Sequence, residues 1–509
     1  MMSRAAQKKK EFGDFQTSPG LAEATTRVLA RLGLQPSAVI EPTCGQGAFV
    51  KAAAEAFPAA SYIFGNDLNP AYIATAGQQT RGDDRVKLQC GDFFGTDWRN
   101  IIDQNMGPWL VIGNPPWVTN AELGALGSSN HPAKTNLHNH TGIEAITGKS
   151  NFDISEWMLL QYIEWLVARG GFIAVLCKTA VARKVLLTAW KKRAPIRNAW
   201  MFHFDAQVHF GAAAAACLFV LELQPGAVNQ SCKVFDSFDV AVPSRTLGYH
   251  AGHLVSDADS FYRWQMLLGP EKTHVWRSGI KHDCSKILEL TPDANGYRNG
   301  LGEIIALEDR YLFPLMKGSD VGNARSRHRK LLLTIQRSVG DDTASIRTDA
   351  PLTWRYLQQH ASHFEKRASS IYRNKPQFSI FGVGPYSYSP WKVAICGLYK
   401  RLCFVCVGPV ADKPVLFDDT VYFLPAASQQ QAEFMVQLLA SKPAAEFLGS
   451  MVSWDDKRPI TADLLRRLNI RQLARVLGRE PEYLRLAGFQ PAPTQRQQEM
   501  SLWVQAGGI

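Results

Sequence analysis

The sequence Trp109-Leu-Val-Ile-Gly-Asn-Pro-Pro-Trp-Val118 decides how this chain is interpreted. The apolar run from Trp109 to Ile112 predicts a buried strand, and Asn114 to Trp117 then form a turn at its carboxyl end. In an open α/β sheet, ligands bind in the crevice at the carboxyl ends of the strands. The turn is therefore predicted to border a binding site.

The chemistry of this turn suits an amino group on an aromatic ring. The Asn114 side chain and the Pro115 carbonyl are hydrogen-bond acceptors, and Trp117 offers a flat face for stacking. The lone pair of an exocyclic amino nitrogen is conjugated with the ring of the base. Two acceptors that bind both N–H protons would draw this lone pair out of conjugation, so that the nitrogen could attack a methyl group. The alternative is structural, with the two prolines closing a strand and Trp117 in the core, and four residues alone do not separate the two.

The surrounding pattern predicts a doubly wound α/β domain. Short apolar runs alternate with helical patterns, which implies a mostly parallel sheet. The last two candidate strands have no helix between them and predict an antiparallel end. The candidate strands are 37–43, 61–67, 85–92, 109–115, 170–177, 198–205 and 215–223, and the helical patterns include 47–57, 70–78 and 153–169.

Polar residues follow the first three predicted strands. Gly45 and Gly47 allow a tight turn, and Asp67 ends the second strand roughly 20 residues later, where nucleotide-binding units place an acid for the ribose hydroxyls. Asp92 and Phe93 end the third strand and suit an adenine edge. Each acid alone is typical of a helix cap, but acids at successive strand ends predict a cofactor site. The glycines lack the pyrophosphate pattern, which favours S-adenosylmethionine.

The order of these motifs resembles the gamma class of amino-methylating DNA methyltransferases, the adenine-N6 enzymes of restriction–modification systems. That class has an N-terminal F/G-x-F-x-T-P element, a glycine motif, the acids and then NPP(Y/F/W). This chain has Gly13-Asp-Phe-Gln-Thr-Ser-Pro19, Gly45 and Gly47, Asp67, Asp92 and then Asn114 to Trp117. An inserted Ser18 interrupts the usual T-P pair, and Trp117 replaces the commoner Tyr.

The resemblance implies roles for individual residues. It makes Asn114, Pro115, Pro116 and Trp117 the catalytic turn, and it adds Phe210 of Val208-His209-Phe210 as a second ring that sandwiches a flipped-out adenine in duplex DNA. In the cofactor site, Gly45 and Gly47 form the turn, Thr17 and Glu41 lie beside the amino-acid end, Asp67 binds ribose, Leu68 packs on the adenine, and Asp92 with Phe93 binds its edge. No metal is required.

The resemblance also implies the domain organisation. A Rossmann-like methyltransferase domain with a mixed sheet spans 1–245, an α+β target-recognition domain spans 246–427, and a helical region spans 428–509. Residues 278–286 are similar to the opening of such recognition domains. The distribution of charge agrees with a separate DNA-binding second half. Residues 1–245 hold 23 basic and 20 acidic residues, whereas residues 246–509 hold 33 basic and 25 acidic residues. A basic second half favours a polyanion such as double-stranded DNA, although charge alone also fits a soluble surface.

Other segments carry weaker signals. Residues 118–152 look irregular and are expected to close over substrate. Within them, His138-Asn139-His140 spells a nuclease motif, but the flanking sequence lacks the ββα pattern that such a metal site needs. The basic run 325–330 and the pair Trp391-Lys392 are candidates for DNA contacts or simply a solvated face and a core strand.

Composition limits the remaining possibilities. The sequence has no apolar stretch of membrane-spanning length and no signal-peptide pattern at its N-terminus, and its nine cysteines fit reduced packing residues. We therefore expect a cytoplasmic protein, held on nucleoid DNA, with a separate restriction endonuclease or defence-system subunit as its partner. Two alternatives are a methyltransferase for an RNA base or a protein glutamine, and a non-catalytic DNA-binding subunit on this scaffold. Cytosine-N4 also remains open as the target.

Overall fold

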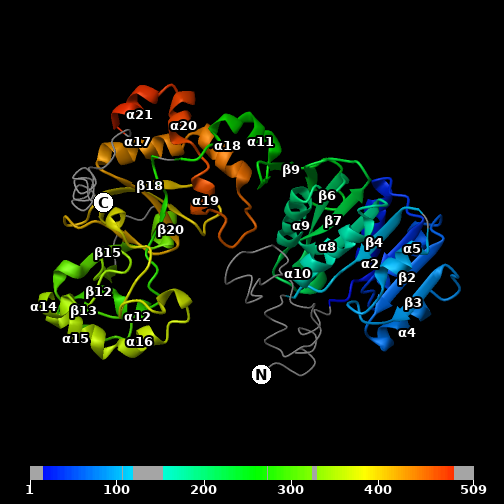
Figure 1. Cartoon of the computed structure of the whole chain (residues 1–509), viewed down its shortest axis with the longest axis horizontal. Coiled ribbons are helices and arrows are strands. Elements are labelled where there is room, and N and C mark those ends of the chain that lie inside the picture. The colour runs from blue at the N-terminus through cyan, green and yellow to red at the C-terminus, as the bar shows by residue number, and fades with distance from the viewer. Residues whose placement is uncertain (1–14, 106, 119–152, 272, 324–329, 487–509) are drawn as a thin grey trace, which may run out of the picture. The chain divides into compact units, whose positions relative to one another are not determined.

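A computed structural model describes residues 15–486 except 106, 119–152, 272 and 324–329. The chain divides into two compact units, Met1–Asp259 and Ser260–Ile509, and their elements are labelled in Figure 1. The expected substrate-closing loop with His138 and His140, apart from Val118, and all of the basic run except Lys330 lie outside the described residues. Among the described residues, no helix is long and apolar enough to cross a membrane.

The first unit contains one ten-stranded mixed sheet in the order β10-β9-β8-β6-β7-β5-β4-β1-β2-β3. Its strands are β1 (Ala38–Glu41), β2 (Tyr62–Asp67), β3 (Val86–Cys90), β4 (Trp109–Gly113), β5 (Gly171–Lys178), β6 (Ile196–Asp205), β7 (Ala215–Leu223), β8 (Ser231–Phe235), β9 (Arg245–His250) and β10 (His253–Val255). The strands from β3 to β5 are parallel, and β7 pairs antiparallel with both β5 and β6. The predicted mixed, doubly wound sheet and its antiparallel end are confirmed.

Helices cover both faces of this sheet. They are α2 (Pro19–Arg31), α3 (Ala48–Ala56), α4 (Pro70–Gln79), α5 (Trp98–Asp103), α8 (Ile154–Leu166), α9 (Thr179–Lys191) and α10 (Ala206–Phe210). Several begin at a polar side chain that accepts from the first turn: Ser18 caps α2, Asn69 caps α4, and Asp153 caps α8. The inserted Ser18 is thus explained, because it caps α2 and places Pro19 at the first helical position.

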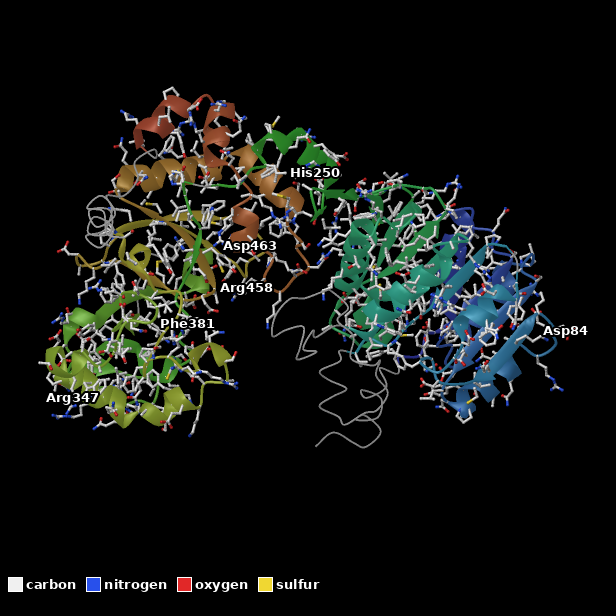
Figure 2. The ribbon with its side chains drawn as sticks, in the orientation of Figure 1. Asp84, His250, Arg347, Phe381, Arg458 and Asp463 are labelled. Atoms are coloured by element: carbon white, nitrogen blue, oxygen red, sulfur yellow. The ribbon has the colours of Figure 1, made fainter. Side chains whose placement is uncertain are left out.

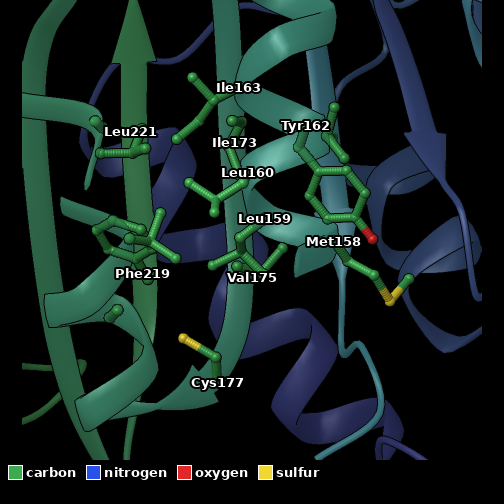
Figure 3. Close-up of a cluster of buried hydrophobic side chains, with 14 of the residues drawn as sticks. Met158, Leu159, Leu160, Tyr162, Ile163, Ile173, Val175, Cys177, Phe219 and Leu221 are labelled. Atoms are coloured by element: carbon green, nitrogen blue, oxygen red, sulfur yellow. The ribbon is translucent and has the colours of Figure 1, made fainter. Parts of the chain in front are cut away.

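The core lies in two layers, one on each side of the sheet. Alternate residues of β4 face opposite layers: Trp109 and Val111 pack with α5, α8 and α9, whereas Leu110 and Ile112 pack with α2 and α3. Figure 3 shows the first layer, where side chains of α8 such as Leu159 lie against β5 and β7. Because both faces of the central strands β1, β4, β5 and β7 are buried, these strands read as largely apolar runs that the sequence located. The sequence did not predict β8, β9 and β10.

The second unit contains two smaller sheets and a helical tail. The four-stranded sheet has the order β11-β20-β17-β18, and the six-stranded sheet has the order β14-β13-β12-β16-β15-β19. The strands are β11 (Arg277–Ser278), β12 (Glu289–Asp293), β13 (Gly296–Arg298), β14 (Ile304–Ile305), β15 (Leu312–Met316), β16 (Lys330–Leu333), β17 (Trp391–Cys396), β18 (Phe404–Val407), β19 (Leu416–Phe417) and β20 (Val421–Ala426). Side chains of both units are drawn in Figure 2.

The two longest helices of the second unit, α17 and α18, lie after residue 428. They are α11 (Ala258–Arg263), which begins at the end of the first unit, α12 (Ser285–Leu288), α13 (Gly318–Gly322), α14 (Ile346–Asp349), α15 (Pro351–Gln359), α16 (Ala361–Glu365), α17 (Gln429–Leu439), α18 (Lys442–Met451), α19 (Ala462–Leu465), α20 (Ile470–Val476) and α21 (Glu480–Leu486). Helix α17 packs on β17 and β18. The α+β character and the helical tail are as predicted, while the domain bounds at 245 and 427 stay predictions.

Candidate active site

A cavity of about 380 Å³ opens where the carboxyl ends of β1, β2, β3 and β4 meet. It brings together most of the residues that the sequence singled out: Thr17, Glu41, Gly45, Asp67, Leu68, Asp92, Phe93, Asn114 and Pro116. A volume in this range is typical of small-molecule sites. Gly47, Pro115, Trp117 and Phe210 do not line the cavity and lie behind or beside its walls.

The glycine loop after β1 is shaped for close approach of a ligand. Gly45 and Gly47 have φ angles of +52° and +86°, a region that side chains disfavour. A Cβ on Gly45 would lie 2.5 Å from the Gln16 side chain, and one on Gly47 would lie 2.6 Å from the Ala76 methyl group. Gly45 therefore keeps the cavity wall thin, whereas Gly47 lets α3 pack closely on α4.

Asp67 links the ends of β1 and β2. Its Oδ2 atom accepts from the Gly45 amide at 2.8 Å, and its Oδ1 atom accepts from the Asn69 amide at 2.8 Å. These two bonds hold the Asp67 carboxylate at the wall of the cavity. Its role in binding ribose hydroxyls stays a prediction.

Glu41 is a buried carboxyl group in the cavity wall. Its side chain is 3% exposed, and Oε2 accepts from the Val50 amide at 3.0 Å. Burial raises the pKa of Glu41 well above its usual value, the Val50 hydrogen bond opposes this, and the nearby Asp67 carboxylate raises the pKa further. The fold therefore favours the neutral form of Glu41 beside the Asp67 carboxylate.

The opposite end of the cavity combines an acid with apolar side chains. Asp92 is exposed and accepts from the Phe94 amide at 3.1 Å, and Leu68 is 50% exposed. Phe93 is 8% exposed and packs on Trp98 with ring centroids 5.2 Å apart. Phe93 is thus mainly a core residue that presents an edge to the cavity, while Leu68 offers an open apolar face.

Asn114 has a fixed orientation in the cavity wall. Its Nδ2 atom donates to the Phe15 carbonyl at 3.0 Å. Its Oδ1 atom is buried and accepts no hydrogen bond from the described residues. A buried acceptor without a partner carries a desolvation cost, so this atom marks a place for a donor that comes from a ligand.

Three aromatic rings lie beside Asn114. Trp117 is 6% exposed, and its ring contacts Phe210 edge-to-face at 5.3 Å and Phe15 at 6.2 Å. Phe15 also contacts Phe210 at 6.0 Å. In this arrangement no base fits between Trp117 and Phe210. The stacking role of these two residues stays a prediction, and it requires Phe210 or Phe15 to move.

The cavity also contains residues that the sequence did not single out. Gln16 accepts from the Gln46 amide at 3.1 Å, and Asn66 donates to the Pro42 carbonyl at 3.3 Å and the Gly91 carbonyl at 3.0 Å. Asn66 thereby joins the loops after β1 and β3. Further lining residues are Phe15, Phe94, Ile154 and Met158. Only Phe15 and Gln16 carried a signal, because they belong to the F-x-T motif.

Comparisons with known proteins found a similar sequence and several similar solved structures. The chain is 42% identical over 483 residues to the type II methyltransferase M.NspV of Nostoc sp., covering 94% of this chain and 100% of that protein. The solved structure of the type IIL restriction–modification enzyme MmeI in complex with DNA covers 99% of this chain and 76% of its own, with a TM-score of 0.48 and 11% identity. The Pyrococcus horikoshii protein PH1948, described as a putative RNA methyltransferase, covers 42% and 88%, with a TM-score of 0.27 and 12% identity. A search of protein-family models found no match.

The fold and the cavity define an S-adenosylmethionine-dependent methyltransferase. The chain belongs to the type II methyltransferases, the DNA-modifying enzymes of restriction–modification systems. The cavity fits the cofactor, because the Glu41 and Asp67 carboxyl groups line it, Gly45 permits close backbone approach and Leu68 exposes an apolar face. Among the residues that the structure describes, no cluster of His, Cys, Asp or Glu is arranged to hold a metal ion.

Proposed function

We propose that this protein methylates the N6 amino group of an adenine that is flipped out of duplex DNA. The observation that carries the proposal is the buried Oδ1 atom of Asn114, directly after β4, which accepts no hydrogen bond from the residues that the structure describes. The amide cannot turn over without losing its bond to the Phe15 carbonyl. An acceptor is therefore presented where an exocyclic amino group needs one.

In the proposed mechanism the chain positions two reactants. Asn114 Oδ1 and the Pro115 carbonyl accept hydrogen bonds from the two N–H groups of the amino nitrogen. These two bonds direct the nitrogen lone pair toward the cofactor. S-Adenosylmethionine supplies a methyl group on a sulfonium, whose neutral thioether is the leaving group. The methylated nitrogen then releases one proton to water. Most of the rate enhancement comes from holding nitrogen and methyl carbon in line.

Base extrusion has to be offset by contacts in the protein. Unstacking and unpairing a base cost a few kcal/mol, and stacking on an aromatic ring contributes about 1–3 kcal/mol per contact. Trp117 and Phe210 are the rings placed to supply it, after the edge-to-face contact between them opens. The acceptor site therefore forms together with the bound base.

The second half of the chain is proposed to select the DNA sequence. Residues 246–509 carry most of the net charge of +11, and basic residues contact DNA phosphates. A methyltransferase with its own recognition domain modifies one motif on chromosomal DNA in the cytoplasm. A separate restriction endonuclease that cuts the same motif is the expected partner, because methylation then protects the host.

The test is methylation mapping by single-molecule sequencing of DNA from cells that express the protein. Wild type is expected to place N6-methyladenine in one motif, and Asn114→Ala is expected to lower the rate about 100- to 1,000-fold, as loss of one preorganised polar contact does elsewhere. Asn100→Ala is the matched control, because Asn100 is an exposed residue of α5. N4-methylcytosine in the motif would overturn the adenine assignment, and an unmodified genome with labelled RNA or protein would overturn the DNA substrate.

A further inference from the structure

Strand β5 extends past the end of β4 beside the Asn114–Trp117 turn. The last pair between these strands is Gly113 with Val175, and β5 continues through Leu176 to Lys178. Residues of the turn therefore have no partner in that strand ladder and need other contacts to fix their path. The extra length of β5 supplies two of them.

The first contact holds the ring of Trp117, and the second holds its backbone. The indole Nε1 donates to the Leu176 carbonyl at 3.3 Å. The Lys178 Nζ donates to the Trp117 carbonyl at 3.1 Å. The ring and the backbone carbonyl of Trp117 are thus both hydrogen-bonded to β5, at Leu176 and at Lys178.

Lys178 is held in turn by a buried carboxylate. Its Nζ lies 2.7 Å from Asp153 Oδ2, and the Asp153 side chain is only 7% exposed. The other oxygen, Oδ1, accepts from the Ser155 amide at 3.2 Å and the Ser155 hydroxyl at 2.5 Å at the start of α8. The ammonium is consequently fixed by a rigid helix end.

The same point ties the turn to α8 directly. The Ile154 amide donates to the Val118 carbonyl at 2.9 Å. Lys178 therefore lies at a junction of three elements, the end of β5, the residue after the two prolines and the start of α8. An ion pair with one buried partner does not by itself favour folding over apolar side chains of similar size, so the presence of this pair at the junction calls for a further reason.

We propose that Lys178 is a positioning residue for methyl transfer, held by Asp153. By fixing the Trp117 carbonyl, it sets the backbone path from Asn114 to Trp117 and so the direction in which the amide and the Pro115 carbonyl face the amino group. This inference rests on the proposed function. Lys178 does not line the cavity, so it acts through the turn and touches neither reactant.

The test compares variants of the full-length protein. Lys178→Met removes the ammonium with a similar chain length, and Lys178→Arg keeps a cation that reaches Asp153. Asp153→Asn removes the charge but keeps a helix cap, because Asn and Asp cap equally well. Lys192→Met is the matched control, since Lys192 ends α9 in an exposed pair with Glu164.

Activity is measured as tritiated methyl transfer from S-adenosylmethionine to genomic DNA from cells that lack the protein. We expect Lys178→Met to lower kcat about 10- to 100-fold, because small misplacement of reacting groups has effects of this size. The KM and Kd for the cofactor should not change. The kcat of Lys178→Arg should recover part of the loss seen in Lys178→Met. The kcat of Asp153→Asn should lie between those of Lys178→Met and wild type, and the kcat of Lys192→Met should equal that of wild type.

Hydrogen exchange separates this inference from the proposed function, since it needs no DNA. The Ile154 amide should exchange faster in Lys178→Met than in wild type, while amides of α3 stay unchanged. If wild type transfers no methyl group to DNA, the proposed function fails, and unchanged exchange at Ile154 would overturn the positioning role independently. An unchanged kcat in Lys178→Met, or a cofactor Kd that weakens as kcat falls, would also overturn it.

Discussion

The proposed site has two halves that differ in how far they are ready for a ligand. The cofactor half lines the cavity, whereas the acceptor half consists of Asn114 and the rings of Phe15, Trp117 and Phe210, of which Trp117 and Phe210 are not part of the cavity lining. In the cofactor half, Asp67 already binds the Gly45 amide, and Leu68 and Asp92 are exposed. In the acceptor half, Trp117 and Phe210 touch edge-to-face and Phe15 contacts both. The cofactor half is thus preformed, whereas the acceptor half has its hydrogen-bond acceptor in place and its stacking rings closed.

This difference follows from what each half is built on. The cofactor half uses loops that leave rigid parallel strands and are fixed by hydrogen bonds to backbone amides. The acceptor half gathers rings from the start of the chain, the turn after β4 and the short helix α10, whose contacts are apolar and non-directional. Polar loops can remain hydrated around an empty site, whereas apolar rings such as those of Trp117 and Phe210 pack against each other in the absence of a base.

Among the changes that test one half of the site without the other, the largest effect on ligand binding should come from Asp67→Ala, which acts on the cofactor half. Loss of a hydrogen bond to a charged group costs about 1.5–3 kcal/mol, so cofactor binding should weaken about 10- to 100-fold. Isothermal titration calorimetry measures it. Asp84→Ala is the control, because Asp84 is an exposed residue, labelled in Figure 2, outside the cavity. Equal affinities for wild type and Asp67→Ala would remove Asp67 from the cofactor site.

A smaller effect is expected from Phe210→Ala, which acts on the acceptor half. Removing one stacking ring should lower kcat/KM for DNA about tenfold, within the range of about 1–3 kcal/mol for a stacked base, with cofactor affinity unchanged. Val208→Ala on the same helix is the control, since Val208 is 75% exposed. If Phe210→Ala were faster than wild type, the contact between Trp117 and Phe210 would be a barrier to base entry that stacking on Phe210 does not offset.

The smallest effect is a pH dependence that belongs to the cofactor half. Because burial raises the pKa of Glu41, its neutral form is favoured in the fold, and its contribution to stability falls as pH rises above the unfolded value. A cationic cofactor favours the carboxylate, so binding releases a proton and strengthens as pH rises toward the raised pKa. Because only one proton is released, the cofactor Kd changes by at most about tenfold per pH unit.

Calorimetry from mildly acidic to mildly alkaline pH measures this slope. Glu41→Gln is expected to bind the cofactor with a flatter pH dependence, because the amide has no proton to release. The variant keeps a side-chain oxygen for the Val50 amide, which makes it a conservative change. An identical slope in wild type and Glu41→Gln would assign the titration to another group.

The sequence predicted the parts of the site that follow from strand order. Asp67, Asp92 and Asn114 come after consecutive parallel strands, and such ends meet at one edge of a sheet, so their proximity could be inferred. The closed packing of Phe15, Trp117 and Phe210 could not be inferred, because motif order states which residues gather and not the angles between their rings. Lys178 was also missed, since it reads as an ordinary charged residue after a strand.

The position of β7 has a consequence for the time course of folding. This strand lies between β5 and β6, although it is synthesised after both. Until residues 215–223 emerge from the ribosome, β5 has an unpaired edge, and contacts far apart along a chain form slowly. Strand β5, which holds the Asn114–Trp117 turn, therefore gains its second neighbour only after residues 215–223 have been synthesised.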